Sequence, residues 1–489
     1  MNFLLLLLVL TLVVLLFLRK SLQKPTVIAH SNSAMSGSKL YYGFKSPDWV
    51  KNASVYQMNI RQMTKEGTIA AAATHLPRIK ELGAEILWIM PFFPICEREK
   101  KQEEGSSPEN SWGSPYAPYD FESIHERLGT FDDFRAFITQ AHELGFKVIL
   151  DFVPNHTGWD SKWMIEHPEW FVHKKDGTIM PVTSDQGEEW ADIAQLDFKD
   201  PALREAWMQA HEFWVKNFDL DGYREDCAWA ISVEWWLELR QRLDAIKPVY
   251  MLAEDEVHGR EQFDVCFETN YGWGTHHFMK QIAQKGAPAS TLHKHTEGIK
   301  ERHGTRGWQM NFTQNHDENT WHGSEYELFG GGADCYMALC FTMEGVGLIY
   351  NGQEVSMGKR LSFFGKDEID WTGASRATFF RTLTDLKKQN KALWSGRNGG
   401  FIEKIPTNHD DKVYAFTREK EGDKVVCIFN MKNEAVDVTL GIADYKGDYH
   451  DVFNKTKYPP NPEYSGGQAL SIGATFSLKP YQFYILTNK

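Results

Sequence analysis

"FDDFRAFITQAHELGFKVILDFVPNH", residues 131–156, contains one complete helix-to-strand unit. Its first fifteen residues space phenylalanine and leucine three and four apart, as an amphipathic helix requires, and end at a glycine suited to a C-cap. A mostly apolar run, FKVILDFVP (146–154), follows at once and is typical of a strand buried on both faces. A helix that leads directly into a buried strand predicts a parallel α/β sheet.

Seven further strand candidates repeat this pattern along the chain. Amphipathic helical stretches such as AAAATHLPRIKELG (70–83) lie between them, and the strand candidates cover residues 53–60, 85–93, 222–228, 249–256, 263–273, 307–317 and 345–355. Eight alternating strand and helix units predict a (β/α)8 TIM barrel, which we place at residues 46–394. After residue 395 short alternating strands such as KVVCIFNM and YQFYILT predict a separate antiparallel β-sandwich domain, residues 395–489.

The first twenty residues contain a hydrophobic stretch, FLLLLLVLTLVVLLFL (3–18). As a helix it would be about 24 Å long, which suits a signal peptide or a short membrane anchor. Basic residues follow it at Arg19, Lys20 and Lys24, and this favours an uncleaved anchor. We expect a signal or anchor segment at 1–20 and a linker at 21–45. The protein should be membrane-anchored or secreted, and the sequence does not indicate on which side of the membrane it lies.

The charge and the cysteines limit the partners of the chain. A formal net charge of −13 over 489 residues argues against nucleic acid or an anionic membrane surface as the main partner, because both need basic patches. The six cysteines are scattered and form no CxxC pair, so neither a zinc site nor a disulfide framework is predicted. A neutral ligand fits this composition better.

Polar residues follow directly after four of the predicted strands, at the end where a TIM barrel carries its active site. A single acid in such a place is commonly a helix N-cap, whereas a set on four strands predicts a reactive centre. The set comprises Asp151, Asn155 and His156, then Arg224 and Asp226, then Glu254, Asp255 and Glu256, and finally Asn315, His316 and Asp317.

Four of these segments resemble the sequence regions of glycoside hydrolase family thirteen, the α-amylase family. They are DFVPNH (151–156), DGYREDCAW (221–229), MLAEDE (251–256) and FTQNHD (312–317), in the family's order. The resemblance extends over all of the chain except the first fifty residues or so. It implies a retaining α-glycoside hydrolase that acts on α-glucans or malto-oligosaccharides.

The resemblance also implies roles for the acids. Asp226 matches the catalytic nucleophile, Glu254 the general acid/base, and Asp317 the third acid, which stabilises the transition state. Glu254 directly follows the apolar residues YMLA (250–253), so burial should raise its pKa. Arg224 lies on the same strand face as Asp226 and should keep that nucleophile ionised. Glu225 must then face the surrounding helices, where we expect a structural ion pair or hydrogen bond.

Further positions match the family's substrate contacts. His156 and His316 correspond to histidines that bind hydroxyls of the sugar on the nonreducing side of the cut, and Tyr119 to the aromatic on which that sugar stacks. Asn315 and Arg224 are also assigned to substrate binding. Asp151 corresponds to an acid that supports the site from the third strand.

The chain departs from true α-amylases after the nucleophile and in the inserted B domain. Trp229 and Ala230 stand where a lysine and a histidine are usual, so we expect Trp229 to contact the substrate and to influence its choice. The insertion is short, at about 157–205, and offers Gln195 where an acid would bind calcium. Asn155 alone does not make a calcium site, so no cofactor is required, although calcium stays possible.

Aromatic residues are dense near the expected cleft, and some of them should stack on sugar rings: Trp112, Trp159, Trp163, Trp170, Trp229 and Trp321. Three alternatives to a hydrolase stay open. The chain could be a transglycosylase or isomerase of the same family, such as a trehalose synthase or a branching enzyme. It could be a non-catalytic membrane module like the heavy subunits of amino-acid transporters, or a starch-binding protein that has lost catalysis.

Overall fold

The computed structural model describes residues 42–102, 107, 110–184, 187–304, 307–455 and 468–489. The predicted hydrophobic segment (1–20) and most of the predicted linker lie outside these residues. Within the described ranges, no helix is both long and apolar enough to cross a membrane. The last residues assigned to the linker already pack on the protein, since the Tyr42 amide donates to the carbonyl of Asp264 and the Arg240 guanidinium lies 4.0 Å from the ring centroid of Phe44.

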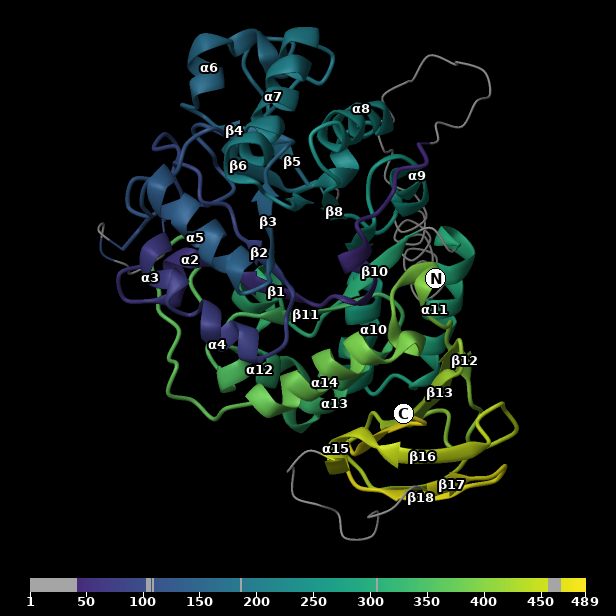
Figure 1. Ribbon diagram of the computed structural model, residues 1–489. Helices are drawn as coiled ribbons and strands as arrows, with labels where there is room; N and C mark the ends of the chain where they lie inside the picture. Colours follow the sequence, from purple (N-terminus) through teal and green to yellow (C-terminus); the bar gives the residue numbers. More distant parts are fainter. Residues whose placement is uncertain (1–41, 103–106, 108–109, 185–186, 305–306, 456–467) are drawn as a thin grey trace, which may run out of the picture. The chain divides into compact units, whose positions relative to one another are not determined.

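Eight parallel strands close into a barrel, which confirms the predicted TIM fold (Figure 1). Around the barrel they follow the order β1-β11-β10-β9-β8-β7-β3-β2, so each neighbours the strand before and after it in the barrel series. The strands are β1 (Val55–Met58), β2 (Ile86–Ile89), β3 (Lys147–Phe152), β7 (Gly222–Glu225), β8 (Tyr250–Ala253), β9 (Thr269–Tyr271), β10 (Trp308–Asn311) and β11 (Val346–Tyr350).

Helices connect these strands and cover the barrel from outside, and short 3-10 turns with one π-turn (η4) complete the connections. The helices are α2 (Ile60–Met63), α3 (Ile69–Ala73), α4 (Leu76–Glu81), α5 (Phe131–Glu143), α7 (Pro201–Phe218), α8 (Val233–Asp244), α9 (Gly259–Val265), α10 (Trp273–Lys285), α11 (Ser290–His303), α12 (Glu325–Phe329), α13 (Ala333–Thr342) and α14 (Ala377–Gln389). The turns are η1 (Asp48–Asn52), η3 (Ala228–Ala230), η4 (Glu318–His322), η5 (Gly330–Gly332), η6 (Gln353–Val355), η7 (Lys391–Leu393) and η8 (Gly396–Asn398).

Local sequence explains where several of these elements begin and end. Thr130 and Asp133 form a reciprocal capping box at the start of α5, and Gly145 follows its end with φ +77°. The helix expected over 70–83 is divided into α3 and α4, because Pro77 occupies the first turn of a new helix. The strand expected over 263–273 is shorter than predicted, since residues 263–265 complete α9.

The insertion after β3 is a small antiparallel sheet beside the barrel mouth. Its strands are β4 (His156–Gly158), β5 (Pro181–Thr183) and β6 (Glu189–Gln195), in the order β4-β6-β5, with the helix α6 (Lys162–Glu166) and the 3-10 turn η2 (Pro168–Trp170). Asp200 caps α7 by accepting hydrogen bonds from the amides of Ala202 and Leu203. Residues 201–205, which the sequence assigned to the insertion, therefore form the first turn of a barrel helix.

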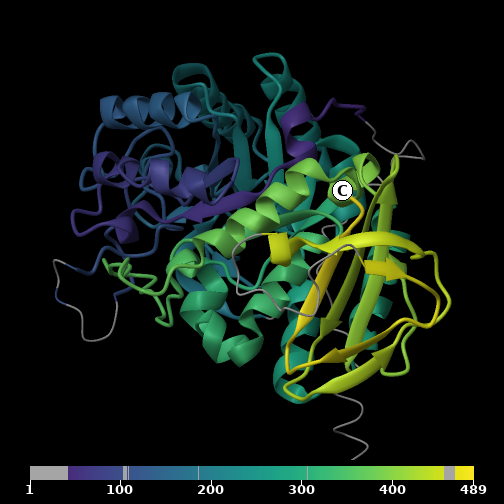
Figure 2. The ribbon, with the colours of Figure 1, turned by 60° about the horizontal axis from the view of Figure 1, so that its bottom comes forward.

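The C-terminal strands form two antiparallel sheets, with long strands side by side in Figure 2. Residues from both sheets, among them Ile428, Val438 and Phe476, share one apolar core, as expected of a β-sandwich. The first sheet has the order β12-β13-β14-β19-β16-β17 and the second pairs β15 with β18. The elements are β12 (Glu403–Lys404), β13 (Val413–Lys420), β14 (Asp423–Asn430), β15 (Val436–Thr439), β16 (Gly447–Asp451), α15 (Val452–Lys455), β17 (Gln468–Leu470), β18 (Thr475–Leu478) and β19 (Phe483–Thr487).

Candidate active site

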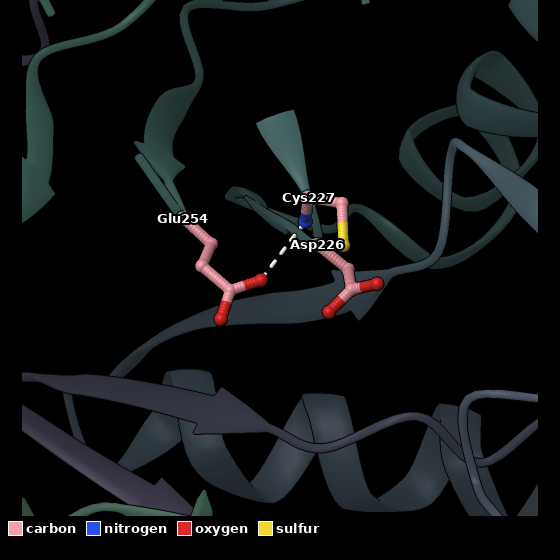
Figure 3. Close-up of side chains that lie close together, drawn as sticks. All are labelled: Asp226, Cys227 and Glu254. Carbon is pink, nitrogen blue, oxygen red and sulfur yellow. Dashed lines mark hydrogen bonds between the residues drawn. The ribbon is translucent and has the colours of Figure 1, made fainter. Parts of the chain in front are cut away.

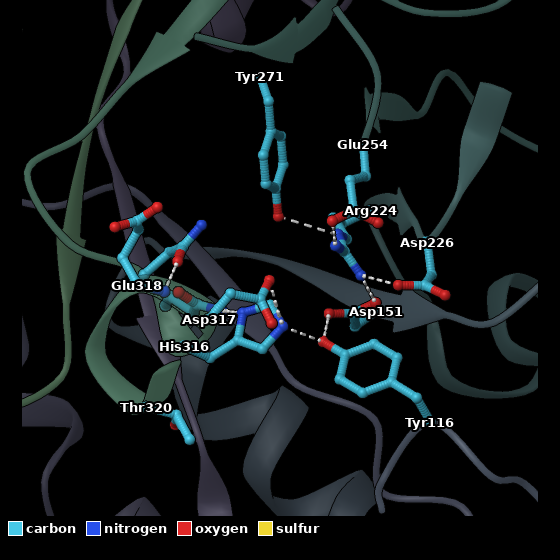
Figure 4. Close-up of polar contacts among 12 residues, drawn as sticks. Tyr116, Asp151, Arg224, Asp226, Glu254, Tyr271, His316, Asp317, Glu318 and Thr320 are labelled. Atoms are coloured by element: carbon cyan, nitrogen blue, oxygen red, sulfur yellow. Dashed lines mark hydrogen bonds and ion pairs between the residues drawn. The ribbon is translucent and has the colours of Figure 1, made fainter. Parts of the chain in front are cut away.

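The ends of β3, β7, β8 and β10 carry a buried network of charges (Figure 4). The strand register places Asp151 of β3 beside Arg224 of β7, and Arg224 beside Leu252 of β8. The residues that follow β7 and β8 therefore come out next to one another at the same barrel end, where active sites of this fold lie.

Arg224 is the centre of this network and has no solvent exposure. Its Nη1 lies 2.7 Å from Asp151 Oδ1 and 3.0 Å from Asp226 Oδ1, and its Nη2 lies 3.0 Å from Glu254 Oε1. Its Nε donates to the hydroxyl of Tyr271 at 3.0 Å. One guanidinium is thus shared by three carboxylates, which keeps the arginine charged and fixes the acids relative to one another.

Asp226 and Glu254 face each other across the site (Figure 3). An oxygen of each carboxyl lies within 4.8 Å of the other. The backbone amide of Cys227, in a left-handed conformation with φ 47°, donates to Glu254 Oε2 at 2.9 Å. A retaining glycosidase needs two carboxyls about 5 to 5.5 Å apart, whereas an inverting one needs about 6.5 to 9.5 Å, so this spacing suits the retaining reaction.

Burial gives the two acids different affinities for protons. It raises the pKa of Glu254 to about 7, reinforced by the carboxylate of Asp226 and opposed by Arg224. It raises the pKa of Asp226 to about 6, against the lowering effect of Arg224. Arg224 acts on Asp226 in the expected direction, but its guanidinium is shared among three carboxyls and the effect of burial is larger. Asp226 still loses its proton before Glu254 does.

Asp317 follows β10 and lies next to this pair. Its Oδ2 is 3.3 Å from His316 Nε2, and burial raises its pKa to about 7, with the charge of Glu254 acting in the same direction. Asp151, by contrast, is fully buried and accepts hydrogen bonds from Tyr116 at 2.9 Å and Trp88 at 3.1 Å in addition to Arg224. Asp151 thus orients the side chains that bound the site and has no access to a substrate.

The tyrosine that reaches the acids is Tyr116, which corrects the assignment of this position to Tyr119. The Tyr116 hydroxyl contacts both Asp151 and His316 Nε2, the latter at 2.7 Å, and its ring lies parallel to the His316 imidazole with centroids 5.4 Å apart. Tyr119 is 38% exposed, and its backbone amide donates to the carbonyl of Pro94. Both tyrosines lie in an irregular loop, where the sequence has no periodicity to show which one turns inward.

Both predicted histidines are buried and brace Tyr116. His156 Nε2 lies 3.0 Å from the carbonyl oxygen of Tyr116, and His316 contacts the hydroxyl of the same residue. Gln57 on β1 contacts His316 Nδ1 at 2.8 Å and fixes the ring from the other side. Burial lowers the pKa of both histidines, that of His156 to about 4, so both rings are neutral at pH 7.

Two other predicted substrate contacts have different surroundings. Asn315 is buried, and its side-chain oxygen accepts from the amide of Glu318 at 2.8 Å, so it shapes the turn that follows Asp317. Trp229 is 37% exposed on η3. The carbonyl of Ala228, beside it, accepts from the side chains of Trp236 and Gln262, which holds the turn that carries Trp229.

Glu225 faces away from the site, as its position between Arg224 and Asp226 on a strand predicts. Its carboxyl is fully buried, 3.4 Å from Nε2 of His211 on α7. The pKa of Glu225 is raised by burial, and His211 opposes this. Neighbouring residues on one strand thus have separate roles, because alternate side chains point to opposite faces.

The residues considered for calcium do not fit that ion. Gln195 Nε2 donates to Asn155 Oδ1 at 2.8 Å, so the two amides satisfy each other and neither brings a negative charge. Calcium is held by six to eight oxygens, carboxylates among them. We therefore derive no step of the chemistry from calcium.

Comparison with protein families identifies two matching regions. The family described as "Alpha amylase, catalytic domain" matches residues 32–424, and "Maltogenic Amylase, C-terminal domain" matches residues 402–485. Among solved structures, a maltogenic α-amylase from Thermotoga neapolitana superposes with a TM-score of 0.78 at 23% identity, covering 90% of this chain and 99% of that one. An α-amylase from Lactobacillus plantarum gives 0.76 at 25% identity, with the same coverage.

Sequence relatives include amylases and transferases. Alpha-amylase 3 of Dictyoglomus thermophilum is 23% identical over 457 residues, covering 80% of this chain and 86% of that protein. Alpha-amylase MalA of Haloarcula japonica is 25% identical over 423 residues, and the match covers 81% of this chain but 58% of that protein. The chain thus spans less than two thirds of some of its relatives. Since the catalytic-domain family covers well over half of its length, the chain belongs to the α-amylase family, glycoside hydrolase family thirteen.

Proposed function

We propose that this protein is a retaining α-glycoside hydrolase that cleaves α-glucosidic bonds in α-glucans or malto-oligosaccharides. The observation that carries the proposal is the pair Asp226 and Glu254, with carboxyl oxygens within 4.8 Å and with different pKa values. Such a pair supplies one ionised and one protonated carboxyl at the same pH. The substrate class rests on the family and on the amylase names of its relatives.

The chemistry takes two steps. An oxygen of Asp226 attacks the anomeric carbon while the bond from that carbon to the leaving oxygen breaks, and the leaving oxygen takes the proton of Glu254. Glu254 then removes a proton from water, whose oxygen attacks the same carbon and releases Asp226. Each step inverts the configuration at the anomeric carbon, so the product keeps the α configuration. The ionised form of Asp317 would add negative charge where the sugar becomes positive.

The direct test is hydrolysis of 4-nitrophenyl α-maltoside by the purified full-length chain, with release of 4-nitrophenol followed in time. We expect turnover that the Asp226→Asn variant lacks. No turnover in either protein would contradict the enzymatic assignment. It would leave the transporter-like module and the non-catalytic glucan binder as the surviving alternatives.

Transfer to a sugar instead of water is the second candidate within the same chemistry. An α-1,4-glucan:maltose-1-phosphate maltosyltransferase of Rhodospirillum rubrum is 36% identical over 179 residues, covering 34% of this chain and 26% of that protein. The intermediate on Asp226 would be the same, and only the acceptor would differ. Products longer than maltoheptaose, formed from maltoheptaose, would favour transfer, and shorter products alone would favour hydrolysis.

The pH profile of kcat/KM should be a bell with its maximum between about 6 and 7. Below pH 6 the nucleophile Asp226 becomes protonated and loses its attacking charge, and above pH 7 Glu254 loses the proton that the leaving group needs. Initial rates on malto-oligosaccharides from pH 4 to 9 measure both limbs. A rate that stays constant from pH 6 to 9 would contradict the role of Glu254.

Glu225→Gln should change kcat/KM by less than about threefold, because this side chain faces α7 and touches His211. The substitution keeps the shape of the side chain. The same assay and a thermal unfolding curve check it. A loss similar to that expected for Asp226→Asn would show that the two acids are assigned to the wrong faces.

We also propose that the hydrophobic stretch 3–18 anchors or exports the protein. Its support is the stretch of sixteen residues, all apolar except Thr11, and the basic residues that follow. Protease protection of the full-length chain in sealed membrane vesicles would show on which side of the membrane the folded domains lie. Recovery of the full-length chain in the soluble fraction of cells would contradict both an anchor and export.

A further inference from the structure

Cys227, the residue directly after Asp226, has an unusual backbone conformation. Its φ of 47° and ψ of 39° are left-handed, a region that a residue with a Cβ atom seldom enters. Five other described residues besides glycine have a positive φ: Glu99, Asp219, Ser356, Glu421 and Tyr481. None of these five is buried, whereas Cys227 is 5% exposed. A strained backbone inside a candidate active site indicates a functional constraint on Cys227.

The left-handed conformation lies where the chain leaves the barrel sheet. The Asp226 amide still pairs with β3, since it donates to the carbonyl of Phe152 at 2.9 Å. The Cys227 amide instead donates to a side chain, Glu254 Oε2, at 2.9 Å. The Cys227 carbonyl accepts from the amide of Ala230 in the η3 turn. Backbone pairing thus ends at Cys227, and its N–H is available to the acid/base.

The side chain of Cys227 contacts the other acid of the pair. Its thiol is hydrogen-bonded to the Asp226 carboxyl, and burial raises the pKa of the thiol, so the sulfur keeps its proton and is the donor. The sulfur and one oxygen of each carboxyl lie within 4.8 Å of one another (Figure 3). Cys227 therefore touches Glu254 through its backbone and Asp226 through its side chain.

Glu254 has one partner on each of its carboxyl oxygens. Oε1 lies 3.0 Å from Arg224 Nη2, and Oε2 accepts from the Cys227 amide. A carboxyl held at one oxygen can still rotate about the bond that carries it, whereas two donors from different directions fix its plane. The Cys227 amide therefore completes the fixation of Glu254 opposite Asp226.

We propose that Cys227 is the positioning residue of the acid/base, and that its left-handed backbone aims the amide that holds Glu254 opposite Asp226. A hydrogen bond to a carboxylate stabilises its charged form. The amide thus favours the state that Glu254 enters when it gives its proton to the leaving oxygen. This inference rests on the proposed hydrolase function and adds a residue that controls its proton-transfer step.

The test compares two substitutions that differ by one methyl group. Cys227→Ser keeps a small side chain with a donor, whereas Cys227→Thr is β-branched and strongly disfavours the left-handed backbone. In the full-length protein kcat/KM is measured on maltotetraose, whose leaving group needs a proton, and on α-maltosyl fluoride, whose leaving group does not. Cys227→Thr should lower the maltotetraose-to-fluoride ratio at least about tenfold from that of the wild type, and Cys227→Ser by less than about threefold.

The alkaline limb of the pH profile on maltotetraose is a second readout. Without the amide the charged form of Glu254 loses a donor, so its pKa should rise above about 7 and the limb should move to higher pH in Cys227→Thr. A residue that only fills space would not move this limb. The other charged and titratable groups that face Glu254 are the same in both variants: Asp151, Arg224, Asp226, Tyr271 and Asp317.

Cys227→Gly provides an independent test, which also applies if thermal unfolding shows that Cys227→Thr does not fold. Glycine adopts the left-handed backbone freely but has no thiol. This variant should therefore keep the maltotetraose-to-fluoride ratio within about threefold of the wild type. A tenfold loss of the ratio in folded Cys227→Gly would show that the thiol and not the backbone sets the proton transfer, and would overturn the proposal.

An unchanged ratio and an unchanged alkaline limb in folded Cys227→Thr would overturn the proposal as well, whether the two rates fall equally or not at all. Cys227 would then have only a packing role. A wild-type protein that hydrolyses neither substrate would instead contradict the proposed function itself.

Discussion

Asp226→Asn is expected to lower kcat on 4-nitrophenyl α-maltoside by at least about 10⁴-fold, because an amide cannot form the glycosyl ester. The substitution keeps the volume of the side chain and can still accept a hydrogen bond from Arg224. It also removes one of three negative charges around that arginine. The fold should therefore persist while the chemistry stops, which a thermal unfolding curve recorded beside the kinetics would show.

The neighbouring acid supplies the matched control. Glu225→Gln changes the same kind of group one residue earlier on the strand, so non-specific effects of replacing a buried acid appear in both variants. Residual activity of Asp226→Asn within a factor of ten of Glu225→Gln would mean that another carboxyl is the nucleophile. Asp317, which is close by and has a raised pKa, would be the first to consider.

Glu254→Gln should lower kcat on maltotetraose by about 10³-fold. The rate of the first step on α-maltosyl fluoride should fall much less. Fluoride leaves without a proton, so only a sugar leaving group depends on the acid. Rates on both substrates, measured with the wild type and the variant, give the two ratios. The alkaline limb of the pH profile should also disappear in the variant, since Glu254 is the group whose pKa of about 7 sets it.

The second step provides an independent check on Glu254. Without the base, water attacks the intermediate slowly, and azide, which needs no base, should restore turnover of α-maltosyl fluoride with α-maltosyl azide as product. Equal losses on the fluoride and on maltotetraose, without rescue by azide, would contradict the assignment of Glu254.

The sequence predicts most of the fold because the information for it is local. Most barrel strands are short, largely apolar runs, such as ILWI in β2 and YMLA in β8, and the eight strands close in chain order. The acids could be placed for the same reason. Asp226 follows β7 and Glu254 follows β8, and parallel strands bring their carboxyl ends to one side. The opposite orientation of Glu225 follows from the alternation of side chains along a strand.

What the sequence could not predict depends on long-range contacts. Tyr116 points into the site because its hydroxyl contacts Asp151 and His316, which are distant in the sequence. The loop that carries Tyr116 and Tyr119 has no local pattern that shows this. The pKa of Asp226 depends on how one buried guanidinium is divided among three carboxyls. Trp321 and Phe363 are 42 positions apart and meet only because η4 and the segment 361–365 are hydrogen-bonded to each other.

The central claim is that Asp226 and Glu254 act as a nucleophile and an acid/base at the spacing of a retaining enzyme. The most direct test is the anomeric configuration of the first product, followed by proton NMR during the early hydrolysis of maltotetraose, before mutarotation. Two successive inversions predict that the α-anomer appears first and the β-anomer only later. Initial release of the β-anomer would show a single displacement by water and would contradict the account.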